Sequence, residues 1–315
     1  MKAKISTEWL SGCSGCHVAV VDLHEKLLNL VEMAEFVRIP VLMDEKGYPP
    51  ADVGIVEGAV RSEHDREALL KLRKSVKTLI AFGTCAVYGG PSGIGWLYDR
   101  DTVIDRVYGN GPTNAPGQRP DAGAVRLEDG VAPVDEVVDV DIYLPGCPPH
   151  PYFIASQIAS LLGSSAPPLT GKTVCADCER TMAKRDGVTL KKGTVTADDD
   201  SLCFLSQGVI CLGSVTLNRC LSPCPGVGVA CTGCNGPSLD IVAEPHLDMR
   251  TLLAKRMNLL YGIPHDEIRT YLEQDAKTFY SYALASPVVY KKPTLEMREW
   301  AGDAPDSSGG DGRER

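Results

Sequence analysis

The stretch that decides the fold reads TLIAFGTC and occupies residues 78–85. Its first five residues are apolar apart from one threonine, which predicts a buried strand that ends at the GTC motif. Two other segments repeat this pattern of a strand followed at once by cysteine. Residues 5–10 run into SGCSGC at 11–16, and residues 137–144 run into PGCPP at 145–149.

Helical patterns separate these strands. Apolar positions recur at helical spacing, and the expected core residues are Val20, Leu23, Leu27, Leu30 and Ala34 in one helix and Leu69, Leu70 and Leu72 in the next, at 63–76. A third helix is predicted at 151–162, and further strands at 36–40 and 53–56. Alternating strands and helices predict an α/β fold, a parallel sheet with helices on both faces.

Four cysteines of the first half are expected to meet at one place. Cys13, Cys16, Cys85 and Cys147 each come shortly after a predicted strand. In open parallel sheets, sites lie outside the carboxyl ends of the strands. We therefore expect these four thiols, which are far apart in the sequence, to lie together at one edge of one sheet.

The other eight cysteines lie within residues 175–234: Cys175, Cys178, Cys203, Cys211, Cys220, Cys224, Cys231 and Cys234. One cubane iron–sulfur cluster takes four thiolates, so twelve cysteines suffice for three clusters and a path for electrons. From spacing alone, structural zinc sites and a thioredoxin-like redox pair at Cys13 and Cys16 stay open. Cys224 precedes a proline, as in ferredoxin-type cluster motifs, which favours clusters over zinc.

The composition limits the other classes of protein. A net charge of −9 argues against a nucleic-acid partner. The sequence has no apolar run near the roughly 18 residues that span a bilayer and no secretion signal, so we expect a cytoplasmic protein without a direct membrane span. In that reducing compartment, this many cysteines indicate metal ligands rather than disulfides.

Four parts are expected along the chain. Residues 1–166 form the sheet domain, with a long irregular excursion at 89–135. Pro167 and Pro168 mark a boundary, and residues 167–245 form a cysteine-rich, loop-dominated domain held by ligand geometry rather than by a hydrophobic core. Residues 246–300 are a helical segment, with helices at 249–261 and 265–283. Residues 301–315 are a polar tail in which we expect disorder.

Three motifs together resemble a known family: WLSGCSGC at 9–16, GTC at 83–85 and LPGCPP at 144–149. They resemble the small subunit of [NiFe] hydrogenases, most closely the cytosolic, group 3 type that reduces methyl viologen and is joined to heterodisulfide reductase. The resemblance implies a flavodoxin-like first domain, an iron–sulfur domain and three [4Fe–4S] clusters. The implied ligands are Cys13, Cys16, Cys85 and Cys147 for the proximal cluster, Cys220, Cys224, Cys231 and Cys234 for the medial cluster, and Cys175, Cys178, Cys203 and Cys211 for the distal cluster.

The chain departs from the best-known members of this family at two positions. Cys175 stands where they have histidine, and Cys224 stands where a proline leaves their medial cluster with three irons. Both differences imply cubanes of low potential. Geometry could exchange Cys211 and Cys220 between the two later clusters. Glu57, at the end of a predicted strand, matches an acidic residue beside the proximal site, although a solvated strand end is an equal alternative.

The resemblance implies an electron-transfer subunit of a hydrogenase. The NiFe(CN)2CO centre would lie only in a partner large subunit, because all twelve thiols are allocated. Electrons would leave to an iron–sulfur or flavin subunit, with heterodisulfide reductase, coenzyme F420, NAD and ferredoxin all open as acceptors. The alternatives are a quinone-linked iron–sulfur subunit of the complex I type, a zinc-stabilised scaffold without redox activity, and a flavodoxin-like FMN carrier.

Overall fold

The protein is described by a computed structural model that covers residues 2–40, 42–109, 111, 112, 115, 117–120, 123–163, 169–192, 199–244, 247–279, 281–286 and 288. The strands are β1 (Ala3–Trp9), β2 (Ala34–Arg38), β3 (Ala51–Glu57), β4 (Val60–Ser62), β5 (Val76–Phe82), β6 (Leu127–Ala132) and β7 (Ile142–Leu144). The helices are α1 (Gly15–Val21), α2 (Glu25–Met33), α3 (Glu63–Ser75), α4 (Thr84–Tyr88), α5 (Arg100–Ile104), α6 (Pro151–Leu161), α7 (Pro223–Gly226), α8 (Leu239–Ala243), α9 (Met249–Tyr261), α10 (His265–Gln274) and α11 (Ala276–Phe279).

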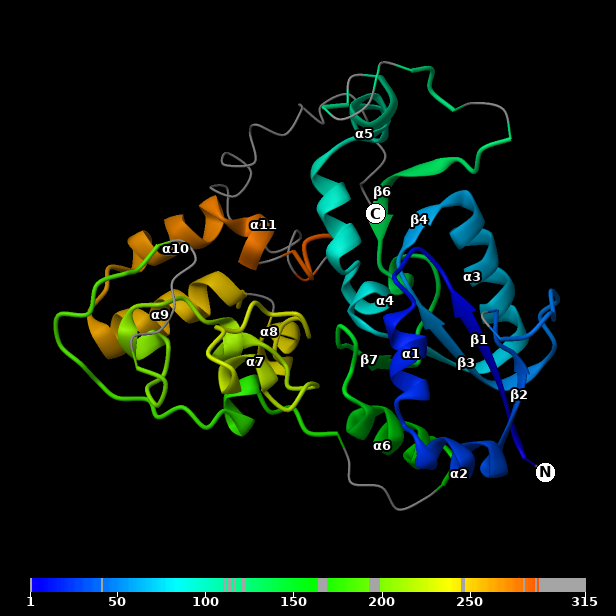
Figure 1. Ribbon diagram of the computed structural model, residues 1–315, viewed down its shortest axis with the longest axis horizontal. Coiled ribbons are helices and arrows are strands. Elements are labelled where there is room, and N and C mark those ends of the chain that lie inside the picture. The colour runs from blue at the N-terminus through cyan, green and yellow to red at the C-terminus, as the bar shows by residue number, and fades with distance from the viewer. Residues whose placement is uncertain are drawn as a thin grey trace.

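The first half of the chain forms a five-stranded sheet in the order β2-β1-β3-β5-β7, in which every pair is parallel (Figure 1). Counted within this sheet alone, the order is 2-1-3-4-5, which is the flavodoxin-like arrangement. The predicted α/β class is therefore confirmed. Trp9, the last residue of β1, pairs with Glu57, the last residue of β3, so these two strands end level at the carboxyl edge.

Helices cover both faces of the sheet, as expected. Buried side chains of α1, α2 and α6 pack on one face, around Ile5, Ile55 and Ile80. Side chains of α3 and α4 pack on the other face, around Val56 and Leu79. Helix α3 begins with a capping box, because the Ser62 hydroxyl accepts from the Asp65 backbone N–H at 3.2 Å and the Asp65 carboxylate accepts from the Ser62 backbone N–H at 2.8 Å.

Two predicted helical cores need correction. The first helix is broken at His24, which has a positive φ of 50°, and Ala34 is the first residue of β2 rather than part of a helix. In α3, Leu70 is 39% exposed, whereas Leu69 and Leu72 are fully buried. Buried positions in α3 recur at spacings of three and four residues, and Leu70 lies outside that stripe.

Two predictions for the second part of the sheet domain were also partly wrong. The strand expected at 137–144 is limited to β7, because pairing with β5 begins only at Ile142 opposite Ile80. The excursion at 89–135 contains α5, a 3-10 turn at Pro91–Leu97 and β6, which pairs antiparallel with β4. Helix α5 lies at the top of Figure 1, beyond the sheet.

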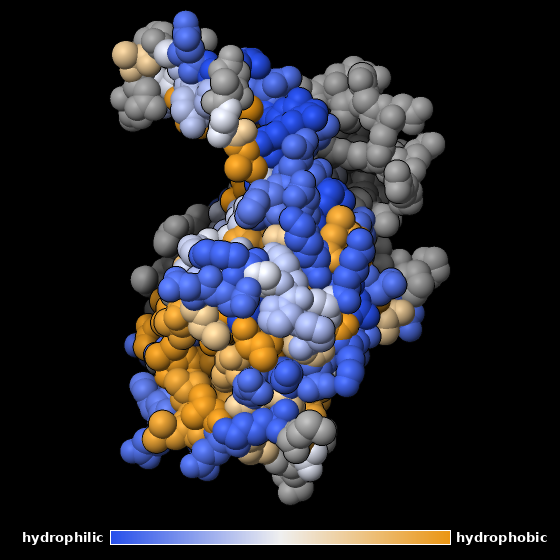
Figure 2. Space-filling view, turned by 90° about the vertical axis from the view of Figure 1, so that its right-hand side faces the viewer, coloured by the Kyte–Doolittle hydropathy of each residue, from blue (hydrophilic) through white to orange (hydrophobic). Residues whose placement is uncertain are grey.

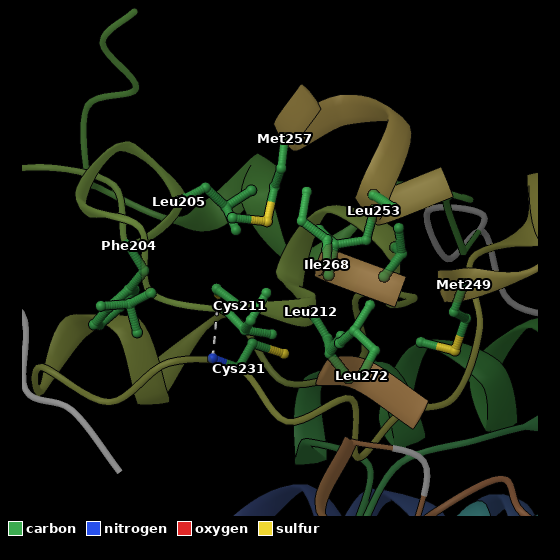
Figure 3. Close-up of a cluster of buried hydrophobic side chains, with 14 of the residues drawn as sticks. Phe204, Leu205, Cys211, Leu212, Cys231, Met249, Leu253, Met257, Ile268 and Leu272 are labelled. Carbon is green, nitrogen blue, oxygen red and sulfur yellow. Dashed lines mark hydrogen bonds between the residues drawn. The ribbon is translucent and has the colours of Figure 1, made fainter. Parts of the chain in front are cut away.

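The cysteine-rich segment has a hydrophobic core of its own, contrary to our expectation (Figure 3). Phe204, Leu205 and Leu212 pack there against Leu253 of α9 and Leu272 of α10. The expectation that ligand geometry alone would hold this segment is wrong, since helices from the C-terminal part complete its core. The second C-terminal helix, expected at 265–283, is divided into α10 and α11.

The C-terminal segment returns to the first domain. A Cβ added at Gly89 would lie 2.7 Å from the Cβ of Ala285, and one added at Gly93 would lie 3.1 Å from it. The buried residue Ala285 therefore packs where these glycines lack side chains. No helix in the described part of the chain is both long and apolar enough to span a membrane. The boundary expected at Pro167 and Pro168 and the tail at 301–315 lie outside the described residues.

Candidate iron–sulfur centres

The first four cysteines lie at the carboxyl edge of the sheet, and we call them the sheet-edge group. Cys13 and Cys16 follow β1, Cys85 is in the first turn of α4, and Cys147 follows β7. Burial raises the pKa of Cys85 to about 12, and the charges of Cys147, Cys13 and Glu57 add to the shift. The pKa of Cys16 is raised by burial, by Glu57 and then by Cys85 and Cys147. The fold therefore brings these four thiols together.

Glycines make room beside two thiols of the sheet-edge group. A Cβ added at Gly83 would lie 2.2 Å from the sulfur of Cys16, and one added at Gly90 would lie 2.4 Å from the sulfur of Cys85. Both glycines have positive φ, of 84° and 58°. A side chain at either position would displace a thiol, so the sequence leaves space there.

Glu57 is buried beside this group at 2% exposure. Its carboxylate accepts a hydrogen bond from the backbone N–H of His17 at 3.0 Å, and its other oxygen lies 2.8 Å from Nδ1 of the same histidine. The Nε2 atom of His17 lies 3.0 Å from the Thr7 hydroxyl oxygen. The carboxylate is also hydrogen-bonded to the Cys16 thiol, so Glu57 is buried against Cys16 and is not solvated. The position of His17, directly after Cys16, was a signal for this contact that sequence reasoning did not use.

Four of the later cysteines form a second cluster of thiols, which we call the far group. Burial raises the pKa of Cys175 to about 12, with further contributions from Cys211, Cys203 and Cys178. Cys211 is buried within the hydrophobic core, and its pKa is raised to about 11. The charges that raise it come from Cys203 and Cys178, and a Cβ added at Gly213 would lie 3.5 Å from the sulfur of Cys175 and 3.6 Å from the sulfur of Cys211, so Cys211 lies beside these three cysteines.

The remaining four cysteines form the middle group. Burial raises the pKa of Cys234 to about 12, with additional contributions from Cys220, Cys147 and Cys224. The pKa of Cys231 is raised by burial, by Cys211 and then by Cys234 and Cys220. Cys220, Cys224, Cys231 and Cys234 thus lie together.

The middle group lies beside both of the others. Cys147 of the sheet-edge group is close enough for its charge to raise the pKa of Cys234. On the other side, the backbone N–H of Cys231 donates to the sulfur of Cys211 at 3.3 Å (Figure 3). The three groups therefore form a series, from the sheet edge through the middle group to the far group.

The donor sets fit iron–sulfur clusters in their chemistry. Each group contains four thiols, the number that one cubane takes. Backbone N–H groups also face the sulfurs, since Gly15 donates to Cys13 at 3.4 Å, and such donors stabilise the negative charge of a cluster. Among the described residues, no three His, Cys, Asp or Glu side chains are placed around the position of a single metal ion.

Sequence reasoning missed Thr84 as a residue of the site. Its hydroxyl oxygen accepts from the Gly146 backbone N–H at 2.9 Å and donates to the carbonyl of Cys234 at 2.6 Å. The adjacent Cys85 was the available signal, but the partners of Thr84 lie 62 and 150 residues further along the chain. Of the histidines near cysteines, His150 caps α6, where its Nδ1 accepts from the backbone N–H of Tyr152 at 3.1 Å.

Comparison with known sequences places the chain among redox subunits. Residues 13–161 match the family described as NADH ubiquinone oxidoreductase, 20 Kd subunit. The chain is 36% identical over 301 residues to a subunit of the F420-non-reducing hydrogenase of Methanothermobacter marburgensis, covering 92% of this chain and 97% of the relative. It is 39% identical over 248 residues to a subunit of the vhu F420-non-reducing hydrogenase of Methanocaldococcus jannaschii, covering 78% and 86%.

Comparison of structures points the same way. A chain of the NAD+-reducing [NiFe]-hydrogenase in the H2-reduced state is 34% identical and superposes with a TM-score of 0.51, covering 53% of this chain and 95% of that one. The complex I alternative is not favoured, because a hydrogenase subunit aligns over 92% of the chain, whereas the match to the family of the 20 Kd subunit ends at residue 161. The chain therefore belongs to the family of [NiFe] hydrogenase small subunits that includes these relatives from the F420-non-reducing hydrogenases.

Proposed function

We propose that this protein carries electrons from a hydrogenase large subunit, where a NiFe(CN)2CO centre oxidises dihydrogen, to an iron–sulfur or flavin acceptor subunit in the cytoplasm. Three [4Fe–4S] clusters would conduct the electrons, a proximal one in the sheet-edge group, a medial one in the middle group and a distal one in the far group. The iron–sulfur domain and the C-terminal helices would form one unit around the last two. The chain catalyses nothing by itself in this proposal.

The series of contacts between the three groups is the observation that carries this function. Cys147 lies near Cys234, and Cys231 donates to the sulfur of Cys211. Ligands of neighbouring groups are therefore adjacent, as transfer between successive centres requires. An electron entering at the sheet edge would have a continuous route through the middle group to the far group.

The residues of the chain have three tasks at these centres. The clusters, when bound, supply one-electron redox chemistry over a range of roughly −700 to +450 mV, which the protein tunes. Burial excludes water from the sulfurs of Cys211 and Cys231, which are each 7% exposed. Backbone N–H groups of Gly213, Cys231 and Gly233 point at these two sulfurs and stabilise their negative charge. The glycines at 83 and 90 keep the space beside Cys16 and Cys85 clear.

The large subunit would dock at the sheet edge. Cys13 and Cys147 are exposed there. Five exposed apolar residues lie on the adjoining helices α1 and α2: Val18, Val21, Leu28, Val31 and Met33. Apolar side chains also gather in the lower left of Figure 2. The left of that view is the side of the molecule that faces the viewer in Figure 1. An apolar surface beside the first ligands supports a partner that covers the proximal cluster and excludes water from it.

The acceptor would dock at the far group. Cysteine at position 175 and a fourth cysteine, Cys224, in the middle group support cubanes of low potential, which suit a low-potential acceptor better than a quinone. Two relatives that align over most of the chain are named for F420-non-reducing hydrogenases. We therefore propose an acceptor subunit other than one that reduces F420.

Anaerobic purification of the chain with its partners tests the proposal. We expect about twelve irons and about twelve labile sulfides in this chain, four of each for every cubane, and nickel only in the large subunit. Zinc without labile sulfide would show that the cysteines hold a scaffold and would overturn the proposal. The identity of the third co-purifying subunit gives the acceptor.

A Cys147→Ser variant tests the entry point of the electrons. We expect it to fold and to bind the large subunit but to lose dihydrogen-driven reduction of methyl viologen, because the first centre lacks a ligand. Dye reduction at the wild-type rate would remove Cys147 from the electron path.

A further inference from the structure

One buried hydroxyl joins the sheet-edge group to the middle group. Thr84 is the first residue of α4 and is 1% exposed. Its oxygen accepts from the Gly146 backbone N–H at 2.9 Å, and its proton is donated to the Cys234 carbonyl at 2.6 Å. The backbone N–H of Thr84 donates in turn to the Gly146 carbonyl at 2.8 Å. The hydroxyl and the backbone N–H of Thr84 therefore both make hydrogen bonds at the junction, by which we mean the place where the sheet-edge group meets the middle group.

The partners of Thr84 are neighbours of cysteines on both sides of the junction. Thr84 precedes Cys85 and Gly146 precedes Cys147, and both of these cysteines belong to the sheet-edge group. Cys234 belongs to the middle group, and the Thr84 hydroxyl donates a hydrogen bond to the backbone carbonyl of Cys234. The Thr84 side chain thus joins the backbone that immediately precedes Cys147 to the backbone of Cys234, and Thr84 itself immediately precedes Cys85.

Close packing surrounds this contact. Tyr88, one turn further along α4, is 7% exposed and lies against Gly236. A Cβ added at Gly236 would lie 2.1 Å from the Tyr88 ring. Gly236 follows Cys234 by two residues. Tyr88 therefore packs α4 against the segment that carries Cys234, and Thr84 adds the hydrogen bond between the same two segments. Buried polar groups in such a place need their partners, because an unmade hydrogen bond there is costly.

We propose that Thr84 is a positioning residue for electron transfer between the proximal and medial clusters, and that its hydroxyl forms the bonded link of the path between them. This inference rests on the proposed function, since it assumes clusters in both groups. One electron moves from the reduced proximal side to the oxidised medial side, no bond forms or breaks, and the proton stays on the Thr84 oxygen. Electronic coupling falls less steeply through covalent and hydrogen bonds than through a gap, so the link from Cys85 through Thr84 to Cys234 favours this step.

The test uses the purified complex with the large subunit and compares Thr84→Val with Thr84→Ser. Valine matches threonine in shape but lacks the hydroxyl, whereas serine keeps it. The probe is dihydrogen, and rapid-freeze electron paramagnetic resonance follows the reduction of each cluster with time. We expect the valine variant to reduce its proximal cluster at the wild-type rate and its medial cluster with a distinct lag. The serine variant should show no lag.

Thr216→Val is the matched control. Thr216 is fully buried, and its hydroxyl donates to the Leu212 carbonyl at 2.7 Å, so this hydrogen bond lies within the cysteine-rich domain and does not reach the sheet-edge group. It should cause no lag between the two clusters. Thr84→Ala replaces Thr84→Val if the valine variant does not fold.

The outcomes separate this inference from the proposed function. Iron analysis and the resting spectra of the wild-type complex come first, and absence of a medial cluster there would contradict the proposed function itself. With the clusters present and their midpoint potentials unchanged, a lag in the valine variant alone supports the role of Thr84. Simultaneous reduction of both clusters in Thr84→Val, or an equal lag in Thr216→Val, would overturn it.

Discussion

The backbone N–H of Cys231 donates a hydrogen bond to the sulfur of Cys211 across the boundary between the middle group and the far group. The two residues lie 20 positions apart in the chain and are both buried. Hydrogen bonds to sulfur are one of the means by which a protein sets the potential of a cluster. A ligand of one proposed cluster is therefore tuned by the backbone of a ligand of the next.

The allocation of Cys211 to the far group gives a first prediction. Cys211→Ser and Cys203→Ser should remove the same electron paramagnetic resonance signal, whereas Cys220→Ser should remove a different one. Each variant should also lose up to about four irons, the content of one cubane. The reason is that the sulfurs of Cys211 and Cys175 both lie within 3.6 Å of a Cβ added at Gly213, and that the charges of Cys203 and Cys178 also act on Cys211. If Cys211→Ser and Cys220→Ser remove the same signal, the two residues share a cluster and the allocation is wrong.

Gly83 gives a second prediction. In Gly83→Ala the new Cβ meets the sulfur of Cys16, so we expect loss of the proximal cluster, about four irons. Gly187→Ala is the control, because Gly187 also has positive φ but has no atom within 4 Å of an added Cβ. It should cost about 1 kcal/mol of stability from the left-handed backbone and keep all of its iron. Full iron in Gly83→Ala would show that Cys16 is free to move.

The core around the later cysteines gives a third prediction. Leu253 is fully buried on α9, and Leu253→Ala should lower the free energy of unfolding by about 2–5 kcal/mol. Leu259, on the same helix, is 77% exposed, and Leu259→Ala should change it by less than about 0.5 kcal/mol. Thermal unfolding of the two anaerobic proteins measures the difference. Equal stabilities would mean that ligand geometry holds this part after all.

A fourth prediction concerns pH and the start of α9. The Asp248 carboxylate accepts from the backbone N–H groups of Arg250 and Thr251, at 2.9 and 3.0 Å, and from the Arg250 guanidinium at 3.0 Å. Burial alone would raise the pKa of Asp248, but the charge of Arg250 and these hydrogen bonds outweigh it, and the net pKa is lowered. A lowered carboxyl pKa in the folded state stabilises the protein above the ordinary carboxyl value, and this stabilisation is lost as the pH falls through the folded value.

Asp248→Asn should therefore be about 1–2 kcal/mol less stable than wild type at pH 7, since a charged hydrogen-bond partner is lost. That difference should persist down to about pH 5 and shrink below about pH 4. The free energies of unfolding of the two proteins, measured in parallel across this pH range, give the difference. Both proteins lose their clusters under the same conditions, so cluster loss cancels in the comparison. Asp240→Asn, at an exposed position of α8, is the control and should change stability by less than about 0.5 kcal/mol. A difference that stays constant to pH 3 would contradict the role of the Asp248 charge.

Much of the sheet domain could be predicted from local pattern. Residues 79–82 of strand β5 are a run of apolar residues that ends at a glycine, and the position of Cys85 after the strand follows from the geometry of parallel sheets. The same reasoning brought Cys13 and Cys147 to one edge. Periodicity was less informative where the chain changes direction, since the turn at His24 interrupts an apolar pattern that continues in the sequence.

The contacts between distant segments could not be predicted in this way. Leu212 and Leu253 share a core although neither segment shows its partner in its own pattern. Likewise, nothing around Thr84 indicates a bond to Cys234, because a hydroxyl can donate to any carbonyl that the fold brings near. The grouping of the cysteines and the order proximal, medial, distal followed from a family resemblance, whereas the individual contacts between neighbouring groups came from the three-dimensional arrangement.

The shared core of the cysteine-rich segment and the C-terminal helices has a consequence for biosynthesis. The ribosome releases the chain from its N-terminus, so all twelve thiols emerge before α9 and α10 are complete. Cys211 and Cys231 become enclosed only when those helices dock. Iron and sulfide must therefore reach the inner cysteines after these thiols have left the ribosome and before the last helices fold onto them.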